Sequence, residues 1–210
     1  RDRDIKVFGW ADSGENVTVS LGSAMVSTTT PASGKWQLTL PKRSASTTPL
    51  SLVVQGKNRV ERTDILIGDV WLCSGQSNME WGLGGCDDPD AIRSSANPLI
   101  RHFGVEMLFA RDPQETVKGS WAVAGPSTSG GFTAVGYYFA RRVVKETGVP
   151  VGLLRSSVLW WCWGRGCSPA PAGYKGISAG KQARIQAMQG IPIEVTAGLG
   201  KGAVRDTAHM

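Results

Sequence analysis

A short polar turn, Ser74–Asn78, stands between an apolar segment and a helix start, and it constrains the fold of this chain most strongly. The segment before it, 63–72, is apolar and rich in β-branched residues, which is typical of a buried strand. After the turn, Ser77 or Asn78 is placed to be the N-cap of a helix with Glu80 in its first turn. The stretch therefore predicts a strand, a sharp turn and a helix at the end of a sheet.

A serine on such a turn presents its hydroxyl at the end of the sheet, and Gly75 lets the backbone turn sharply there. Backbone N–H groups at the start of the following helix point toward an oxyanion that forms beside them. Ser77 is therefore a candidate nucleophile, and its own backbone N–H is a candidate oxyanion donor. The alternative is a loop that is simply rich in turn formers, because the match to Gly-x-Ser-x-Gly stops at Asn78.

The whole string from Gly68 to Trp81 closely resembles the serine block of the sialate O-acetylesterase family, carbohydrate esterases of the SGNH-hydrolase type. In that family the serine of Gly-Gln-Ser-Asn-Met accepts the acyl group, which implies this role for Ser77. The resemblance covers roughly residues 1 to 157, with further matching segments at 100–103, 131–141 and 148–154. It implies hydrolysis of acetyl esters of sugars, an acetylated carbohydrate as substrate partner, no metal or organic cofactor, and a secreted or periplasmic location.

Residues 1–66 carry short strands with turn signals about every ten residues, which predicts an all-β, sandwich-like domain. We expect the natural protein to start further upstream, because Arg1-Asp2-Arg3 resembles the end of a longer family motif. Trp10 and Trp36 are expected in the core, and a sugar-binding surface is the alternative. The expected strands are 5–10, 17–21, 25–29, 36–40 and 50–54.

From Asp64 the pattern alternates between strands and helices, with the clearest helix at 132–147. This predicts an α/β fold with an SGNH-hydrolase-like (flavodoxin-like), doubly wound parallel sheet, incomplete here, over residues 67–187. Ligands of such sheets bind at the carboxyl ends of the strands. Residues 188–210 are expected to form a divergent, disordered tail. The other expected elements are strands at 99–105, 117–124 and 151–154 and a short helix at 89–96.

The chain departs from the family after Leu154. The family continues there to Trp-Gly-Gly-Thr, whose glycine N–H helps form the oxyanion hole, and Gly164 is the candidate for that glycine here. The run from 158 onward is instead rich in Trp, Cys, Gly and Arg. A frame error or a degenerate copy is one interpretation, and the alternative is a sugar-stacking patch made by Trp160, Trp161 and Trp163.

A serine nucleophile needs a histidine as general base and a carboxylate that orients this histidine. Family members carry an Asp-x-x-His pair near their end, and Asp206 and His209 have that spacing here. His102, the other histidine of the sequence, lies mid-strand and is expected to be a packed structural residue. If no base is present, the chain is an inactive fragment or degenerate paralogue, and a further alternative is a β-sandwich sugar-binding module.

The charge distribution, the hydrophobicity and the cysteine content argue against nucleic-acid-binding, membrane and zinc-binding proteins. Of the net charge of +6, five units lie in residues 151–210, where basic residues are scattered among glycines and form no recognisable nucleic-acid module. No apolar run is long enough to span a membrane, so neither nucleic acid nor a membrane is expected as a partner. The four cysteines suit no spaced zinc site, and no metal is expected. Cys73 is expected to be an inert buried thiol, and a bridge from Cys86 to Cys162 or Cys167 is a further possibility.

Overall fold

A computed structural model describes residues 1–106, 117–157 and 194–196 of the chain. By its contacts the chain divides into two compact units. The first unit contains Arg1–Asp69 and the short strand Glu194–Thr196, and the second begins at Val70.

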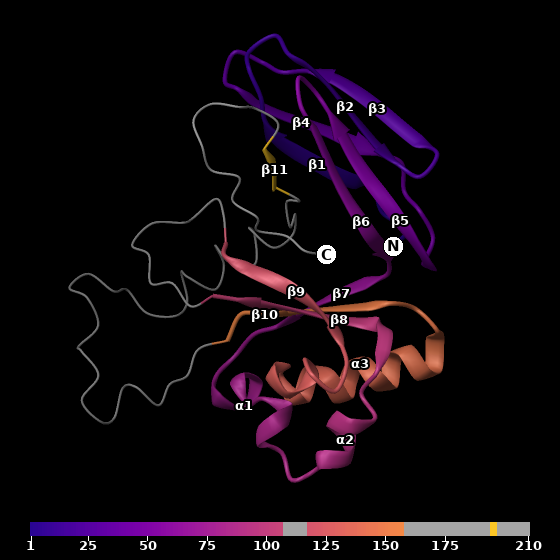
Figure 1. The fold of residues 1–210 in the computed structure, drawn as a ribbon, viewed down its shortest axis with the longest axis vertical. Helices are drawn as coiled ribbons and strands as arrows, with labels where there is room; N and C mark the ends of the chain where they lie inside the picture. Colours follow the sequence, from indigo (N-terminus) through magenta and orange to yellow (C-terminus); the bar gives the residue numbers. More distant parts are fainter. Residues whose placement is uncertain (107–116, 158–193, 197–210) are drawn as a thin grey trace, which may run out of the picture. The chain divides into compact units, whose positions relative to one another are not determined.

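The first unit is all-β among its described residues, as the sequence predicted (Figure 1). One sheet has the antiparallel order β3-β2-β5-β6 and consists of Ala24–Thr29, Asn16–Leu21, Ser46–Gln55 and Arg59–Ile67. The other has the order β11-β1-β4 and consists of Glu194–Thr196, Ile5–Trp10 and Lys35–Leu40. Strand β1 pairs antiparallel with β4 and parallel with β11.

Buried side chains from both of these sheets form one hydrophobic cluster. Burial alternates along β2 and β4, because successive side chains of a strand point to opposite faces. Trp36 is 1% exposed within this cluster, which confirms its predicted core position. Trp10 is only half-buried and contacts Phe8 edge to face, with ring centroids 6.0 Å apart.

The apolar run 63–72, expected as one buried strand, is divided between two strands. Strand β6 ends at Ile67, Gly68 follows, and β7 runs over Asp69–Cys73. Among the described strands β7 is an edge strand, so its middle residues Val70, Trp71 and Leu72 are exposed and only Cys73 is buried. The prediction of a single buried strand is therefore wrong, because an apolar run alone does not distinguish an edge strand from a central one.

The second unit contains a sheet of order β7-β10-β8-β9. Strand β8 (Asn97–Val105) pairs in parallel with β10 (Val151–Arg155) and antiparallel with β9 (Gly119–Ala124). The described sheet is therefore mixed, not parallel throughout as expected. Strands β8 and β9 are consecutive among the described strands and pair antiparallel, whereas the chain between β8 and β10 includes the helix Ala134–Thr147, and parallel pairing requires such a crossover.

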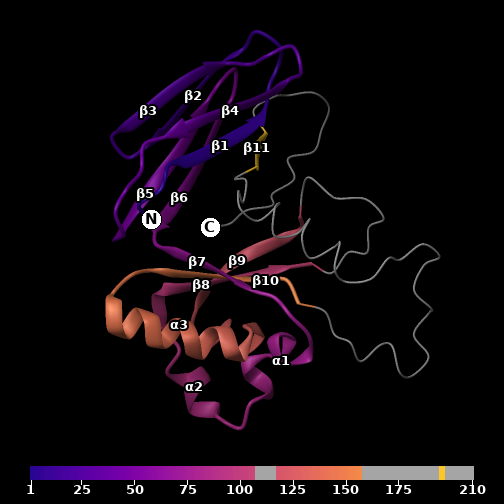
Figure 2. The ribbon, with the colours of Figure 1, turned by 180° about the vertical axis from the view of Figure 1, so that it is seen from behind.

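Three helices lie on the same face of this sheet, as Figures 1 and 2 show. They are α1 (Ser77–Glu80), α2 (Pro89–Arg93) and α3 (Ala134–Thr147), and two 3-10 turns occur at Leu83–Gly85 and Ser129–Gly131. Helix α3 matches the predicted helix except that it starts two residues later. It ends at Gly148, which has a φ of +67° and donates its N–H to the Val144 carbonyl at 2.8 Å.

Helix α3 packs very closely on the end of β7 through Gly136. A Cβ atom at this position would lie 2.9 Å from the Cys73 sulfur and 2.7 Å from the Thr133 Cγ2 atom. Since real Cβ contacts are not this short, any larger residue would force the helix or the strand to move. Gly136 therefore fixes the distance between α3 and the strand that leads into the Ser77 turn.

We predict that Gly136→Ala lowers the free energy of unfolding, because overpacking a core costs about 1–3 kcal/mol. The gain of about 1 kcal/mol that alanine provides over glycine inside a helix offsets part of this cost, so the expected net loss is up to about 2 kcal/mol. Urea denaturation followed by circular dichroism measures the difference. Gly131→Ala is the matched control, because a Cβ atom there meets nothing within 4 Å. A Gly136→Ala protein as stable as the wild type would contradict the prediction.

Candidate active site

The carboxyl ends of three strands meet at one edge of the second unit's sheet. Strands β8 and β10 run in the same direction, with Arg155 opposite Gly104 at their ends. The backbone N–H of Ser156 donates to the Cys73 carbonyl at 2.9 Å, so β7 also ends beside β10. In open α/β sheets this edge is where ligands bind.

Ser77 is the first residue of α1 and follows the end of β7 after three residues. The Gln76 carbonyl accepts the N–H groups of Met79 and Glu80 at 3.0 and 3.1 Å, so Gln76 occupies the N-cap position. The prediction that Ser77 or Asn78 caps this helix is wrong, and Gln76 makes no side-chain hydrogen bond as the cap. The position of the first helical carbonyl decides the cap, and side-chain preference does not reveal it.

At this position neither the backbone N–H nor the hydroxyl of Ser77 is used in a hydrogen bond within the helix. The first N–H groups of a helix have no partner within the helix, and the N–H of Ser77 is one of them. Ser77 is half-buried, and its hydroxyl makes no hydrogen bond to another described residue. The hydroxyl is therefore not packed away from the sheet edge.

The carboxylate of Glu80 lies one helical turn after Ser77 and contacts the residues at the end of β10. The Ser157 hydroxyl donates a hydrogen bond to Glu80 Oε2. Arg155 Nη1 lies 3.5 Å from Glu80 Oε1, and the Glu80 side chain is only 13% exposed. Sequence reasoning placed Glu80 in the first helical turn, which is confirmed, but it gave no sign of these partners.

His102 is a packed residue of β8, as predicted, and is 5% exposed. Its ring stacks on Phe132 with centroids 4.6 Å apart, and its Nε2 accepts the Thr133 N–H at 3.4 Å. Burial, together with the positive charge of Arg155, lowers the pKa of His102 to about 4. His102 is therefore neutral at ordinary pH.

Residues at and just before the start of α3 hold α1 and the segment that follows it. The Ala134 N–H donates to the Trp81 carbonyl and the Leu83 N–H donates to the Phe132 carbonyl, both at 2.9 Å. The Thr133 hydroxyl donates to the Met79 sulfur at 3.4 Å. This support was not predicted, since residues this far apart in sequence gave no pairing signal.

Cys73 is the other nucleophilic side chain next to the turn, and it is 5% exposed. Burial raises the pKa of its thiol to about 11, so the reactive thiolate is scarce at neutral pH. The expectation of a buried thiol is confirmed. The suggested bridges to Cys162 and Cys167 fall outside the described residues.

Several candidate residues lie outside the part of the chain that the structure describes. These are the base candidates Asp206 and His209, the oxyanion candidate Gly164, and the tryptophans Trp160, Trp161 and Trp163. Among the described residues, no group of three or more His, Cys, Asp or Glu side chains is placed to hold a metal ion. No helix in the described ranges is long and apolar enough to cross a membrane.

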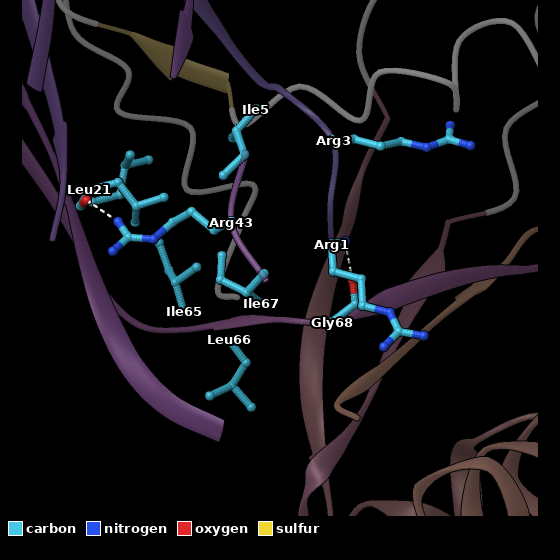
Figure 3. Close-up of a pocket in the computed structure, with 10 residues that line it drawn as sticks. Arg1, Arg3, Ile5, Leu21, Arg43, Ile65, Leu66, Ile67 and Gly68 are labelled. Carbon is cyan, nitrogen blue, oxygen red and sulfur yellow. Dashed lines mark hydrogen bonds between the residues drawn. The ribbon is translucent and has the colours of Figure 1, made fainter. Parts of the chain in front are cut away.

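A separate pocket of about 180 Å³ lies in the first unit (Figure 3). Its lining is aliphatic side chains and arginines, and Arg43 Nη1 donates to the Leu21 carbonyl at 2.7 Å. Arg1 pairs with Asp69 at 3.0 Å. The lining contains no serine, cysteine or histidine, so this pocket offers no nucleophile for ester cleavage.

Comparisons with known proteins find similar proteins that are named sialate O-acetylesterase and carbohydrate acetylesterase. The scan against protein-family models found no match. The sialate O-acetylesterase of Rattus norvegicus is 29% identical over 179 residues, which cover 72% of this chain and 32% of that protein. The sialate O-acetylesterase of Mus musculus is 36% identical over 104 residues, 45% of this chain and 19% of that protein.

A solved structure, that of a carbohydrate acetylesterase from Xanthomonas citri, matches with a TM-score of 0.73 and 37% identity. The match covers 75% of this chain and 37% of that one. The chain thus matches only 19–37% of the length of these proteins. Sequence and fold together confirm the resemblance seen at Gly68–Trp81: the chain is related to the sialate O-acetylesterase family of carbohydrate esterases.

Proposed function

We propose that this chain carries the nucleophile of a carbohydrate O-acetylesterase and that the nucleophile is Ser77. The observation that carries the proposal is the position of Ser77, half-buried at the first residue of α1 where the carboxyl ends of β7, β10 and β8 meet. The names of its relatives, sialate O-acetylesterase and carbohydrate acetylesterase, support an acetylated sugar as substrate.

In this mechanism the Ser77 oxygen attacks the acetyl carbonyl carbon while a histidine takes the hydroxyl proton. The carbonyl oxygen becomes an oxyanion, which the Ser77 backbone N–H stabilises. When the tetrahedral intermediate collapses, the bond to the sugar oxygen breaks and the histidine returns its proton to that oxygen. Water then attacks the acetyl-serine, which releases acetate and restores the hydroxyl.

The general base is proposed to be a residue other than His102. The Nε2 of His102 already accepts the Thr133 N–H, and no hydrogen bond joins its ring to Ser77. The pair Asp206 and His209 therefore stays the candidate for the base and its orienting carboxylate, and Gly164 stays a candidate oxyanion donor. If that pair does not serve, the chain is an inactive fragment or degenerate paralogue.

Three further features stay proposals that rest on the same family relationship. They are the SGNH-hydrolase type of the fold, an N-terminal β-sandwich domain over 1–66, and a secreted or periplasmic location. The alternative function as a sugar-binding module has less support, because Trp36 is a core residue and only Trp10 is partly accessible.

We predict that Ser77→Ala lowers the rate of p-nitrophenyl acetate hydrolysis by about a thousandfold or more, since it removes the attacking atom. Ser74→Ala is the matched control from the same turn and retains activity near that of the wild type. Release of acetate from acetylated sialic acid and from acetylated xylan then identifies the preferred sugar. Equal activity of Ser77→Ala and the wild type would reject the nucleophile, and an inactive wild type would support the fragment alternative.

The pH dependence of kcat/KM tests which histidine is the base. Because the pKa of His102 is about 4, an enzyme that used this ring would lose activity only near pH 4. A base with an ordinary imidazole pKa of about 6.5 loses activity as the pH falls below that value. We expect the second profile in p-nitrophenyl acetate assays between pH 3.5 and 8, with circular dichroism at each pH to confirm folding. A half-maximal rate near pH 4 would contradict a base with an ordinary imidazole pKa.

A further inference from the structure

The segment that carries Ser77 is attached to the end of β10 on both sides of the serine. Before the turn, the Cys73 carbonyl accepts the Ser156 N–H at 2.9 Å. After it, the Glu80 carboxylate accepts the Ser157 hydroxyl and lies 3.5 Å from Arg155 Nη1. Three consecutive residues of one strand end therefore bind the residues that flank the Ser77 turn.

Ser77 and Glu80 are the first and last residues of the single turn α1. Residues three positions apart in a helix lie on the same face, so Ser77 and Glu80 point to the same side of α1. The partners of Glu80 must then lie on that side as well. A shift of residues 155–157 would change the surroundings of the Ser77 hydroxyl.

The contacts of Glu80 with Arg155 and Ser157 are largely buried. Its side chain is 13% exposed and the Arg155 side chain is 26% exposed, so water screens the pair less than it screens a surface pair. Replacing a buried carboxylate leaves its partners without a matching charge, and they then take other positions. The arrangement is therefore held by three groups, Glu80, Arg155 and Ser157, that depend on one another.

We propose that Glu80 is a positioning residue for the esterase reaction. Its carboxylate holds residues 155–157 against α1, and this keeps Ser77 and the neighbouring strand end in the geometry that attack on the acetyl carbonyl needs. The inference rests on the proposed function of Ser77. Glu80 itself does not touch the reacting atoms in this account, and it acts through the placement of Ser77 and the end of β10.

Kinetics of Glu80→Gln test the proposal in the full chain. Glutamine keeps an oxygen that can accept the Ser157 hydroxyl but loses the charge that faces Arg155. A misplacement of about 1 Å at a reacting group costs on the order of 100-fold in rate, so we expect kcat to fall roughly 10- to 100-fold with KM changed less than about threefold. Ser157→Ala removes one hydrogen bond, keeps the ion pair, and should give a smaller fall in kcat.

Two controls separate positioning from simple loss of folding. Glu146→Gln removes an exposed carboxylate that pairs with Arg142 at 3.2 Å on α3, and it should leave kcat unchanged. Intact-mass measurement after reaction with a fluorophosphonate gives the fraction of protein with a reactive serine, and kcat is expressed per reactive serine. A merely structural role would lower that fraction but leave this kcat at the wild-type value.

The outcomes distinguish this inference from the function on which it rests. Wild-type kcat per reactive serine in Glu80→Gln overturns the positioning role, whatever Ser157→Ala shows, and leaves the esterase proposal standing. A wild type that neither hydrolyses acetyl esters nor reacts with the fluorophosphonate overturns both. A reduced kcat per reactive serine in Glu80→Gln, with Glu146→Gln unchanged, supports the inference.

Discussion

The hydrogen bond from the Ser156 N–H to the Cys73 carbonyl joins the ends of β10 and β7, and the placement of Ser77 depends on this junction. At the same strand end, Gly136 allows α3 to approach the Cys73 sulfur more closely than any side chain would permit. Strand β7 is therefore fixed at its last residue, although its middle residues are exposed. The serine turn begins directly after this fixed point.

Burial also decides which groups near the turn are available for chemistry. The raised pKa of Cys73 keeps its thiol protonated, and the lowered pKa of His102 keeps its imidazole neutral and bound to the Thr133 N–H. Ser77 combines a nucleophilic atom and partial exposure with a place at the first residue of α1, and its hydroxyl makes no hydrogen bond to another described residue. These differences in environment support the turn as the proposed site of acyl transfer.

Local signals predicted most of the described elements. The alternating burial of β2 and β4 follows from alternating apolar residues, and Gly148 ends α3 because it takes a left-handed conformation. The family relationship was also indicated by a local sequence motif, the residues around Ser77. In each case neighbouring residues carry the information, so it can be seen in the sequence.

The remaining features depend on pairing between distant segments. Ser157 and Glu80 are 77 positions apart, and nothing in either neighbourhood indicates that they meet. The exposure of Trp71 follows from the edge position of β7, which is a property of the sheet and not of the apolar run. The N-cap at Gln76 follows from the position of one carbonyl, although Ser77 has the better capping side chain.

The most direct measurement of the central claim is to identify the residue that a fluorophosphonate modifies in the folded wild-type chain. The adduct can be located by peptide mass spectrometry after digestion. If the sheet edge presents an activated hydroxyl, the phosphonyl group will be found on Ser77 and not on Ser74. An adduct on another residue, or none under conditions in which the chain hydrolyses acetyl esters, would contradict the account.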